Sequence, residues 1–465
     1  MEKYDLVVIG SGPGGYPAAI RAAQLGASVA LVEKDILGGT CLNWGCIPTK
    51  TLIASSDLFH RARRADSMGI CVENVSFDYA AMLERKDAVV EKLRSGVAQL
   101  LKGNKVTVFE GVGSFKDRKT IVVKKDKEKT AIEAANTIIA TGAKSTVPEF
   151  LPKHDRIVAS RAFLTRTELP ESMIVLGGGI IGCEFACMAA QLGVKVTIVE
   201  MLEDIVLTLD RDIRRELRRH MEKTLDIEVL TGASLEDVKA DGGSVGGKAG
   251  DERITADLLL VSVGRRPVTD GLALDKAALE TDEAGYIPVD DYCQTRAGTI
   301  YAIGDVTGGV QLAHRATSQG LTAAENACGP NRRKMETVVP ACIFTAPEIG
   351  SVGLSEQDAK EQGIKVRTGK YPFSALGKAM ALGDTLGFVK WVADADTDQL
   401  LGAHAIGPHA TELIAEATLA IRDELTAREL GKAVHCHPTL SESWMEAAHA
   451  VHGESVHAAP RRKPR

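Results

Sequence analysis

The 465-residue sequence lacks an apolar run long enough to cross a bilayer, and it lacks an excess of basic charge. Its formal net charge of -6 arises from acidic and basic residues interspersed along the chain, which excludes the electrostatic footprint of a nucleic-acid-binding protein. Export-signal features are absent from the first residues, which enter a strand pattern at YDLVVIG. We therefore expect a cytoplasmic protein whose partners are neither a membrane nor a nucleic acid. The basic cluster PRRKPR (460–465) is predicted to be a disordered end.

Cysteine is also scarce: nine residues, an odd number, are spread along a chain long enough for about three or four domains. This usage indicates a reducing compartment and mostly free thiols. Cys41 and Cys46 nevertheless stand close together in GGTCLNWGCIPTK (38–50). Zinc would require a second close pair or a set of cysteine and histidine ligands, and neither accompanies these two residues. The sequence therefore predicts no metal site here.

Two segments repeat one pattern of strand, glycine turn, helix and strand: YDLVVIGSGPGGYPAAIRAAQLGASVALVEK and SMIVLGGGIIGCEFACMAAQLGVKVTIVE. The G-x-G-x-x-G spacing is met by Gly10, Gly12 and Gly15 and again by Gly177, Gly179 and Gly182. In this pattern the first glycine allows a tight turn, the second lets backbone amides approach a pyrophosphate, and the third allows close packing of helix on strand. Glu33 and Glu200 each lie 23 residues after the first glycine, where a carboxylate accepts from a ribose hydroxyl. The 167-residue displacement of the whole pattern indicates an internal duplication with two dinucleotide sites.

The second site is predicted to take NAD rather than NADP. Glu200 is followed by Met201 and Leu202, and no arginine stands there to receive a 2′-phosphate. The glycine-rich run DGGSVGGKAGDE (241–252) precedes a strand rather than a helix, so we expect a hairpin loop and not a phosphate cradle.

Three further apolar strands end in glycine: TIIATGA (137–143), LLLVSVGRRP (258–267) and TIYAIGDVTG (299–308). The first two would be the closing strands of the two nucleotide-binding halves. The third places Asp305 just beyond a strand end, where the carboxylate could bind a sugar-like hydroxyl chain or cap a turn. We favour the binding role because two nucleotide folds are already present.

An exchanging dithiol is the best reading of Cys41 and Cys46. Pro48 and the helical run KTLIASSDLFHRARR follow them, so a positive helix end would face the thiols and favour the thiolate. The pair also follows directly after the first nucleotide-binding unit, which would place it beside the cofactor. Two free thiols without a role are the alternative.

A candidate general base lies far along the chain in HCHPTLSE (435–442). Pro438 restricts the backbone after His437, and Glu442 could orient one ring nitrogen and stabilise the imidazolium. His435 and His437 could instead form a metal-binding pair, but a third ligand is not evident. His435 is expected to be structural.

Together the dithiol segment, the two glycine units, GDVTGG and HCHPTLSE resemble the flavin-dependent disulfide reductases, the class I pyridine nucleotide-disulfide oxidoreductases, from Tyr4 to about His449. The resemblance implies an α/β fold with two Rossmann-like dinucleotide-binding domains, for FAD and for NAD, and a C-terminal α+β dimerisation domain. The implied domains are 1–145 for FAD, 146–272 for NAD, 273–338 as a central domain completing the FAD site, and 339–465 as the interface with a flexible basic tail.

The activity that the resemblance implies is oxidation of protein-bound dihydrolipoamide with reduction of NAD+ to NADH. Its partners would be a second copy of the chain and the lipoyl domains of an acyltransferase core or a lipoylated carrier protein. Cys41 would be the interchange thiol and Cys46 the thiol against the flavin. His437 and Glu442 would serve the dithiol of the other subunit. Reduction of another disulfide or of a metal ion, and a non-enzymatic nucleotide-binding role, are the alternatives.

The resemblance also assigns residues to the cofactor sites, in addition to the glycines and acids of the two turns. Lys50 and Glu184 would pair near the reactive nitrogen of the flavin. The remaining flavin-side positions are Pro13, Gly14, Lys34, Thr40, Gly113, Thr141, Gly142, Ala313 and His314, and the remaining nicotinamide-side positions are Ile180, Ile181, Gly264 and Arg265.

Three residues depart from the family pattern. Trp44 stands between the cysteines where a small aliphatic residue is usual, so it affects the thiol pocket. Cys436 replaces a small residue between the histidines and is expected to be buried and inert. Pro17 falls early in the first predicted helix, where proline is tolerated only near the first turn.

Overall fold

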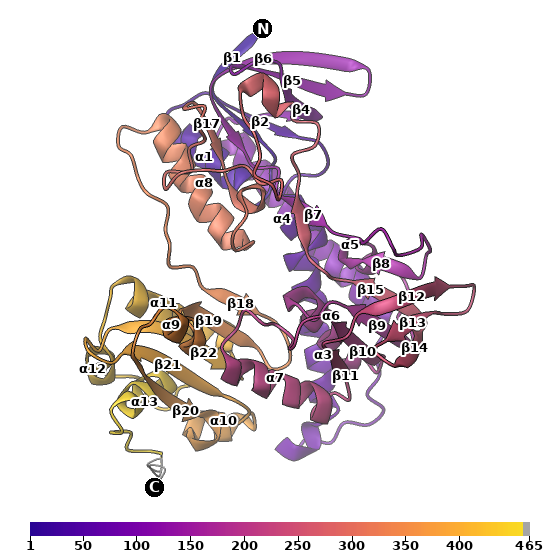
Figure 1. Ribbon diagram of the computed structural model, residues 1–465, viewed down its shortest axis with the longest axis vertical. Coiled ribbons are helices and arrows are strands. Elements are labelled where there is room, and N and C mark those ends of the chain that lie inside the picture. Colours follow the sequence, from indigo (N-terminus) through magenta and orange to yellow (C-terminus); the bar gives the residue numbers. More distant parts are fainter. Residues whose placement is uncertain (459–465) are drawn as a thin grey trace.

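The first glycine unit forms the centre of a seven-stranded sheet in the computed structural model, which describes residues 1–458 (Figure 1). The last four residues of β1 (Glu2–Ile9) are buried, and the strand pairs in parallel with β2 (Val29–Glu33) and with β6 (Glu128–Ile139). The strand order is β3-β2-β1-β6-β5-β4, and β17 joins β6. The added strands are β3 (Thr107–Glu110), β4 (Val112–Phe115), β5 (Thr120–Lys125) and β17 (Ile300–Ala302). The tail predicted to be disordered, 460–465, lies outside the described residues.

Four helices accompany this sheet: α1 (Gly15–Gln24), α3 (Cys46–Ala62), α4 (Tyr79–Gly103) and α8 (Ala313–Cys328). Helix α8, from the middle of the chain, packs closely on α1 (Figure 1). The approach is tight at Gly320, where a Cβ atom would lie 2.3 Å from the carbonyl oxygen of Gly14. The first glycine turn is therefore enclosed by two segments that are about 300 residues apart in the chain.

The second glycine unit forms a five-stranded parallel sheet of order β11-β10-β9-β15-β8. Its strands are β8 (Ile157–Ala159), β9 (Ser172–Leu176), β10 (Lys195–Glu200), β11 (Glu228–Thr231) and β15 (Leu258–Val261). Helices α6 (Ile180–Gln191) and α7 (Arg211–Thr224) make the crossovers, as a parallel sheet requires. All four residues of β15 are buried, which explains why this strand is a continuous apolar run.

The glycine-rich run 241–252 corrects one prediction. It is not a loop throughout, because β13 (Val245–Ala249) lies within it and pairs with β12 (Leu235–Ala240) and β14 (Glu252–Ala256) in a three-stranded antiparallel sheet. The prediction was wrong because Gly246 and Gly247 serve close packing between strands. A Cβ atom at Gly246 would lie 2.3 Å from the carbonyl oxygen of Ile254, and one at Gly247 would lie 2.5 Å from that of Glu236.

The C-terminal part is a five-stranded antiparallel sheet of order β18-β19-β22-β21-β20. The strands are β18 (Ala341–Ile343), β19 (Ile349–Gly353), β20 (Val366–Pro372), β21 (Phe388–Asp394) and β22 (Leu400–Ile406). Helices α11 (Ala410–Arg422) and α13 (Glu442–Val451) pack on it. Trp391 and Trp444 are fully buried between β21 and α13, and the indole N–H of Trp391 donates to the carbonyl of Trp444 at 3.0 Å.

A buried ionic cluster joins this C-terminal sheet to α7 of the second sheet. The ammonium group of Lys390, on β21, lies 3.0 Å from a carboxylate oxygen of Asp210, and both side chains are almost fully buried. Asp212 and Glu356 contribute further carboxylates at 3.3 and 2.8 Å. Because Asp210 also caps the first turn of α7, the cation on one sheet holds the start of a helix on the other.

The remaining α-helices and strands are short. They are α2 (Gly39–Trp44), α5 (Ser160–Phe163), α9 (Glu356–Glu361), α10 (Gly377–Leu382) and α12 (Ala427–Lys432), and a two-stranded link of β7 (Ala143–Ser145) with β16 (Arg265–Pro267). Within residues 1–458, no helix has both the length and the apolar character that a membrane span needs. The α/β sheets and the separate C-terminal α+β part confirm the predicted fold class. The domain boundaries stay a prediction.

Candidate active site

The two glycine turns have the same backbone geometry. Gly10 and Gly177, the first glycines, have positive φ angles of 103° and 105°. A Cβ atom on Gly10 would lie 2.4 Å from the carbonyl oxygen of Ala140, and one on Gly177 would lie 2.7 Å from that of Ser262. Other residue types are therefore excluded at both positions by conformation and by space.

The other two glycines of each turn differ from each other in a way that indicates a ligand. A Cβ atom on Gly15 would lie 1.9 Å from the Gly10 carbonyl oxygen, and one on Gly182 would lie 2.1 Å from that of Gly177, so helix and strand touch there. Cβ atoms on Gly12 and Gly179 would instead meet nothing within 4 Å. The space in front of both turns is open at the helix N-terminus, where the pyrophosphate of a dinucleotide fits.

Each predicted ribose acid lies beside its turn. One oxygen of Glu33 accepts hydrogen bonds from the Ser11 amide and hydroxyl at 2.8 and 2.6 Å, and the other accepts from the Asp35 amide. Glu200 does the same with the amides of Gly178 and Leu202, at 2.6 and 2.8 Å. The duplication thus extends to the hydrogen bonds that orient both carboxylates at the carboxyl edge of each sheet.

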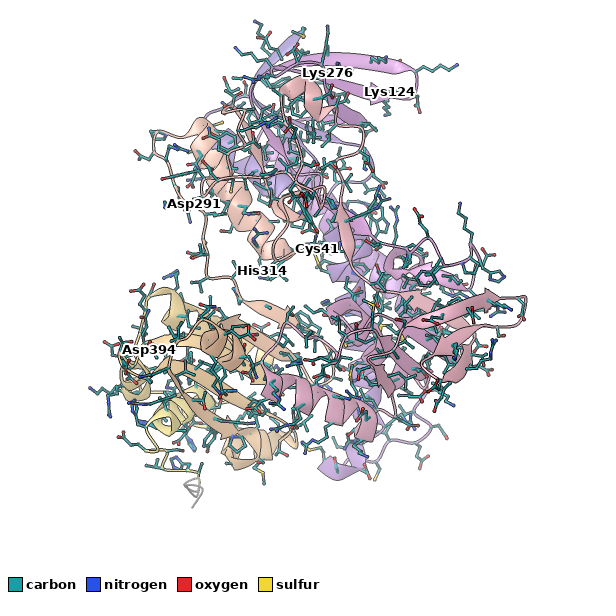
Figure 2. All side chains as sticks on the ribbon, in the orientation of Figure 1. Cys41, Lys124, Lys276, Asp291, His314 and Asp394 are labelled. Carbon is teal, nitrogen blue, oxygen red and sulfur yellow. A yellow bond between two sulfur atoms is a disulfide. The ribbon has the colours of Figure 1, made fainter. Side chains whose placement is uncertain are left out.

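The dithiol segment contacts the first turn directly. Cys41 and Cys46 form a disulfide with a Cα–Cα distance of 4.6 Å. Just before it, Gly39 lies so near the turn that a Cβ atom would be 2.6 Å from the Cα atom of Gly12, and the Gly38 amide donates to the Ser11 hydroxyl at 3.1 Å. Cys41 lies near the middle of the molecule (Figure 2). The segment that carries the disulfide is therefore held against the first dinucleotide turn.

The local sequence explains the position of Cys46. It is the first residue of α3, so its sulfur is at the positive end of a 17-residue helix, and Pro48 occupies the first turn, where no amide donor is needed. The helix begins four residues earlier than the predicted run at Lys50, which makes Cys46 part of it. A thiolate formed at Cys46 would be stabilised there.

Lys50 and Glu184 form an ion pair from two different helices. The Lys50 ammonium lies 2.6 Å from one oxygen of Glu184, whose side chain is 5% exposed. The other oxygen of Glu184 accepts from the Phe344 amide at 2.9 Å, and the Phe344 ring lies 4.8 Å from the Lys50 nitrogen. The pair therefore connects α3, α6 and the start of the C-terminal sheet one helical turn after the disulfide. Sequence analysis did not find Phe344, because it carries no local signal.

Asp305 lies beyond β17, as predicted, and it faces two arginines. The guanidinium of Arg265 is 3.8 Å from its carboxylate. Burial raises the pKa of Asp305, while the positive charges of Arg265 and Arg315 oppose the rise. Sequence analysis placed Arg265 on the nicotinamide side only, and the structure brings it to Asp305 through the β7–β16 link. The hydroxyl-binding role of Asp305 stays a prediction.

His437 and Glu442 form the predicted pair. Nδ1 of His437 lies 2.9 Å from one oxygen of Glu442, and the Thr439 amide donates to the other oxygen at 2.8 Å. Burial alone would raise the pKa of Glu442, but the hydrogen bonds from Thr439 and His437 hold it below its ordinary value. Since an ionised carboxylate can only accept, Nδ1 carries the hydrogen and Nε2 is free to accept a proton. The His437 side chain is 78% exposed in the single chain.

The neighbouring residues have structural contacts. The His435 ring lies 2.7 Å from Glu416 and is almost fully buried, which fits the expected structural role. Cys436 corrects a prediction: it is exposed, not buried, because it lies in an irregular segment (433–438) of which only His435 is largely covered. Among residues 1–458, no group of three or more histidine, cysteine, aspartate or glutamate side chains could hold a metal ion.

Trp44, the departure within the dithiol segment, has a defined partner. The Arg161 guanidinium lies 3.6 Å from the centre of its ring and 3.5 Å from the carboxylate of Asp35. Pro17 is the third residue of α1, where a missing amide donor is tolerated. Neither residue displaces a group of the predicted site.

The other predicted cofactor residues lie around the two turns or near them. His314, in the first turn of α8, contacts the Pro340 carbonyl at 2.6 Å, and Thr141 donates to the Val268 carbonyl. Gly113 packs against side chains of Val32 and Ile9, so core packing explains this glycine. The remaining ones are Pro13, Gly14, Gly142, Gly264, Ile180, Ile181 and Ala313 at turns and helix starts and Lys34 and Thr40 on the surface. Their contacts with a cofactor stay predictions.

A disulfide against one dinucleotide turn, a second turn of equal geometry and a separate histidine–carboxylate pair define a nucleotide-dependent disulfide oxidoreductase. The chain belongs to the pyridine nucleotide-disulphide oxidoreductase family. The family's model matches residues 4–320 of the chain, and the model of the family's dimerisation domain matches residues 339–448. The resemblance inferred from the sequence motifs is thereby confirmed.

Curated relatives and solved structures agree with this assignment. Dihydrolipoyl dehydrogenases of Chlamydia muridarum and Bacillus subtilis are each 43% identical to this chain, covering 99% and 98% of it and 100% and 99% of the relatives. The structure of LpdA from Mycobacterium tuberculosis matches with a TM-score of 0.90 at 28% identity, covering 96% of this chain and 99% of that one. The flavoprotein disulfide reductase RclA from Escherichia coli matches with a TM-score of 0.86 at 29% identity, covering 95% and 98%.

Proposed function

We propose that the protein catalyses the dihydrolipoyl dehydrogenase reaction, in which dihydrolipoamide is oxidised to lipoamide and NAD+ is reduced to NADH. FAD and NAD are its cofactors. Its macromolecular substrates would be lipoyl domains of an acyltransferase core or a lipoylated carrier protein, in the cytoplasm, and it would act as a homodimer. The contact between the dithiol segment and the first glycine turn is the observation that carries the proposal, because it holds an exchangeable disulfide against a dinucleotide site.

The chemistry at the disulfide is two successive thiol exchanges. A thiolate of dihydrolipoamide attacks the sulfur of Cys41, the Cys41–Cys46 bond breaks, and Cys46 leaves as a thiolate at the positive end of α3. The second thiol of the substrate then attacks the substrate sulfur of the mixed disulfide and releases Cys41. Lipoamide is formed, and two electrons remain on the cysteine pair.

The protons of the two substrate thiols require a base, and His437 is the proposed one. Glu442 holds Nδ1–H and leaves Nε2 to accept, and the imidazolium that forms is stabilised by the same carboxylate. When bound, FAD supplies the two-electron relay to NAD+. Lys50 and Glu184 would orient the flavin edge beside α3, and Gly12 and Gly179 leave room for the two pyrophosphates.

The test is NADH formation from free dihydrolipoamide by the FAD-loaded protein, with NADP+ and glutathione disulfide with NADPH as comparisons. We expect activity with dihydrolipoamide and NAD+ and little with the others. Cys41→Ser should lower this activity at least about a thousandfold, because no mixed disulfide can form. NADH oxidation by an artificial acceptor should partly survive, since it needs no dithiol. Full dihydrolipoamide oxidation by Cys41→Ser would refute the proposal.

A further inference from the structure

Helix α7 carries an arginine-rich face whose members have different partners. The arginines are Arg211, Arg214, Arg215, Arg218 and Arg219. Arg215 and Arg219 are largely exposed and pair with acids one turn away on the same helix. Arg214 and Arg218, four residues apart on one face, are more buried, with side chains 11% and 32% exposed. These two side chains are therefore the members of the face that lie closest to the second sheet.

Arg218 reaches the strand next to the ribose acid. Its guanidinium donates to the hydroxyl of Thr231 at 3.2 Å and to the carbonyl of Val229 at 3.3 Å, both on β11. Thr231 is the register partner of Glu200 on β10. The side chain thus extends along the helix toward its N-terminus and the carboxyl edge of the sheet, in the direction that helical side chains favour.

Asp204 binds both arginines. Its carboxylate oxygens lie 3.1 Å from a guanidinium nitrogen of Arg214 and 3.7 Å from one of Arg218. Arg218 is also paired with Glu222 at 2.9 Å. The Asp204 side chain is 22% exposed, so water screens these charges less than at an open surface. Asp204 and Glu222 together therefore balance the two cations that the helix brings to this edge.

The loop that carries Asp204 is fastened to the second glycine turn. The Val206 amide donates to the Gly178 carbonyl at 2.8 Å, and the Gly178 amide donates to Glu200. At the other end of the loop, the Leu202 amide donates to the second oxygen of Glu200. Asp204 and its two arginines consequently lie on the ribose side of the turn, next to the carboxylate that would accept from the 2′-hydroxyl.

We propose that Asp204 is a specificity-determining residue for the nicotinamide coenzyme, because it pairs with the arginines that would otherwise attract the 2′-phosphate of NADP. A 2′-phosphate carries about -1.5 to -2 charges and would meet the carboxylates of Glu200 and Asp204, while Arg214 and Arg218 are already paired with acids. The sequence shows no arginine directly after Glu200, but the fold supplies two from α7. This inference rests on the proposed function, in which the second turn binds NAD.

Binding of two nucleotide fragments to the FAD-loaded protein tests it without turnover. Calorimetric titrations would use adenosine 5′-monophosphate and adenosine 2′,5′-bisphosphate. In Asp204→Asn we expect the Kd for the bisphosphate to fall about tenfold while the Kd for the monophosphate changes less than about twofold. Adding Arg214→Gln to that variant should remove the gain. Arg214→Gln alone should raise the bisphosphate Kd, because Asp204 then keeps a negative charge that Arg214 no longer balances.

Asp251→Asn is the matched control, since it removes one negative charge from the turn between β13 and β14 of the same half. An unchanged ratio of the two Kd values in Asp204→Asn, an equal change in Asp251→Asn, or tighter bisphosphate binding in Arg214→Gln alone would overturn the role of Asp204. Absence of monophosphate binding in every form, the unaltered chain included, would refute the nucleotide site itself. Monophosphate binding without dihydrolipoamide oxidation would refute only the proposed function.

Discussion

At the scale of single residues, the histidine–carboxylate pair is prepared in advance of any substrate. Glu442 accepts from two donors, His437 and the Thr439 amide, so its orientation does not depend on the histidine alone. Its pKa is held below the ordinary glutamate value, and the carboxylate therefore stays ionised through the neutral range. As the pH falls through this lowered pKa, both hydrogen bonds to the charged form are lost.

Glu442→Gln should lower kcat for dihydrolipoamide about 10- to 100-fold, because an amide neither selects the useful tautomer of His437 nor stabilises its charged form. NADH oxidation by an artificial acceptor should stay within about twofold, since it needs no thiol base. Steady-state kinetics of both reactions give the comparison. Glu454→Gln, an exposed change three residues beyond α13, serves as the control. An equal fall of both activities in Glu442→Gln would contradict the assigned role.

At the scale of elements, local patterns and tertiary contacts differ in how far a sequence can predict them. The two glycine turns were predictable because each depends on neighbours within one strand–turn–helix unit. The pairing of Arg214 with Asp204 was missed, since it requires a loop to fold back on Gly178. The exposure of Cys436 was predicted wrongly because burial depends on which distant element covers a segment. The Lys50–Glu184 pair came only from the family resemblance.

The ionic cluster at Lys390 connects β21 with the start of α7. Lys390→Met should destabilise the fold by about 3 to 5 kcal/mol at pH 8. Three carboxylates would then share a mostly buried site without their cation. Urea unfolding measures the loss. Lys360→Met, which removes an exposed partner of Glu356, should cost less than about 0.5 kcal/mol. A loss as small for Lys390→Met would contradict this role of the cluster.

The pH dependence of the stability loss in Lys390→Met follows from the pKa shifts of Asp212 and Glu356. Burial opposes the charged forms of Asp212 and Glu356, yet the nearby lysines hold the pKa of both below their ordinary values. Depressed carboxylate pKa values contribute stability above the unfolded values of 3.8 and 4.5, and this stability is lost as the pH falls through the folded values. The free-energy difference between Lys390→Met and the unaltered chain should therefore shrink as the pH falls below the unfolded values of 3.8 and 4.5 toward the folded ones.

At the scale of the whole molecule, the disulfide and the proposed base lie in different parts of one chain. Cys41 lies near the middle of the molecule, whereas α13, which begins at Glu442, lies in the C-terminal part at the lower left (Figures 1 and 2). His437 is 78% exposed, as expected for a group that serves a surface outside its own chain. The match to the family's dimerisation domain covers this region.

Mixed dimers show whether His437 acts on the disulfide of its own chain or on that of the other subunit. Cys41→Ser and His437→Ala homodimers should each be almost inactive. After random exchange of equal amounts, half of the dimers are mixed and each has one intact site, so roughly a quarter of the full activity should return. No recovery, despite exchange verified by mass spectrometry, would mean that His437 acts within its own chain.

The cation buried between β21 and the start of α7 has a consequence for assembly. It joins the second sheet to the C-terminal sheet, so neither sheet can move relative to the other without breaking several charged contacts. By reciprocity, if association of two chains changes the affinity of the second glycine turn for its nucleotide, nucleotide binding changes the dimer dissociation constant by the same factor.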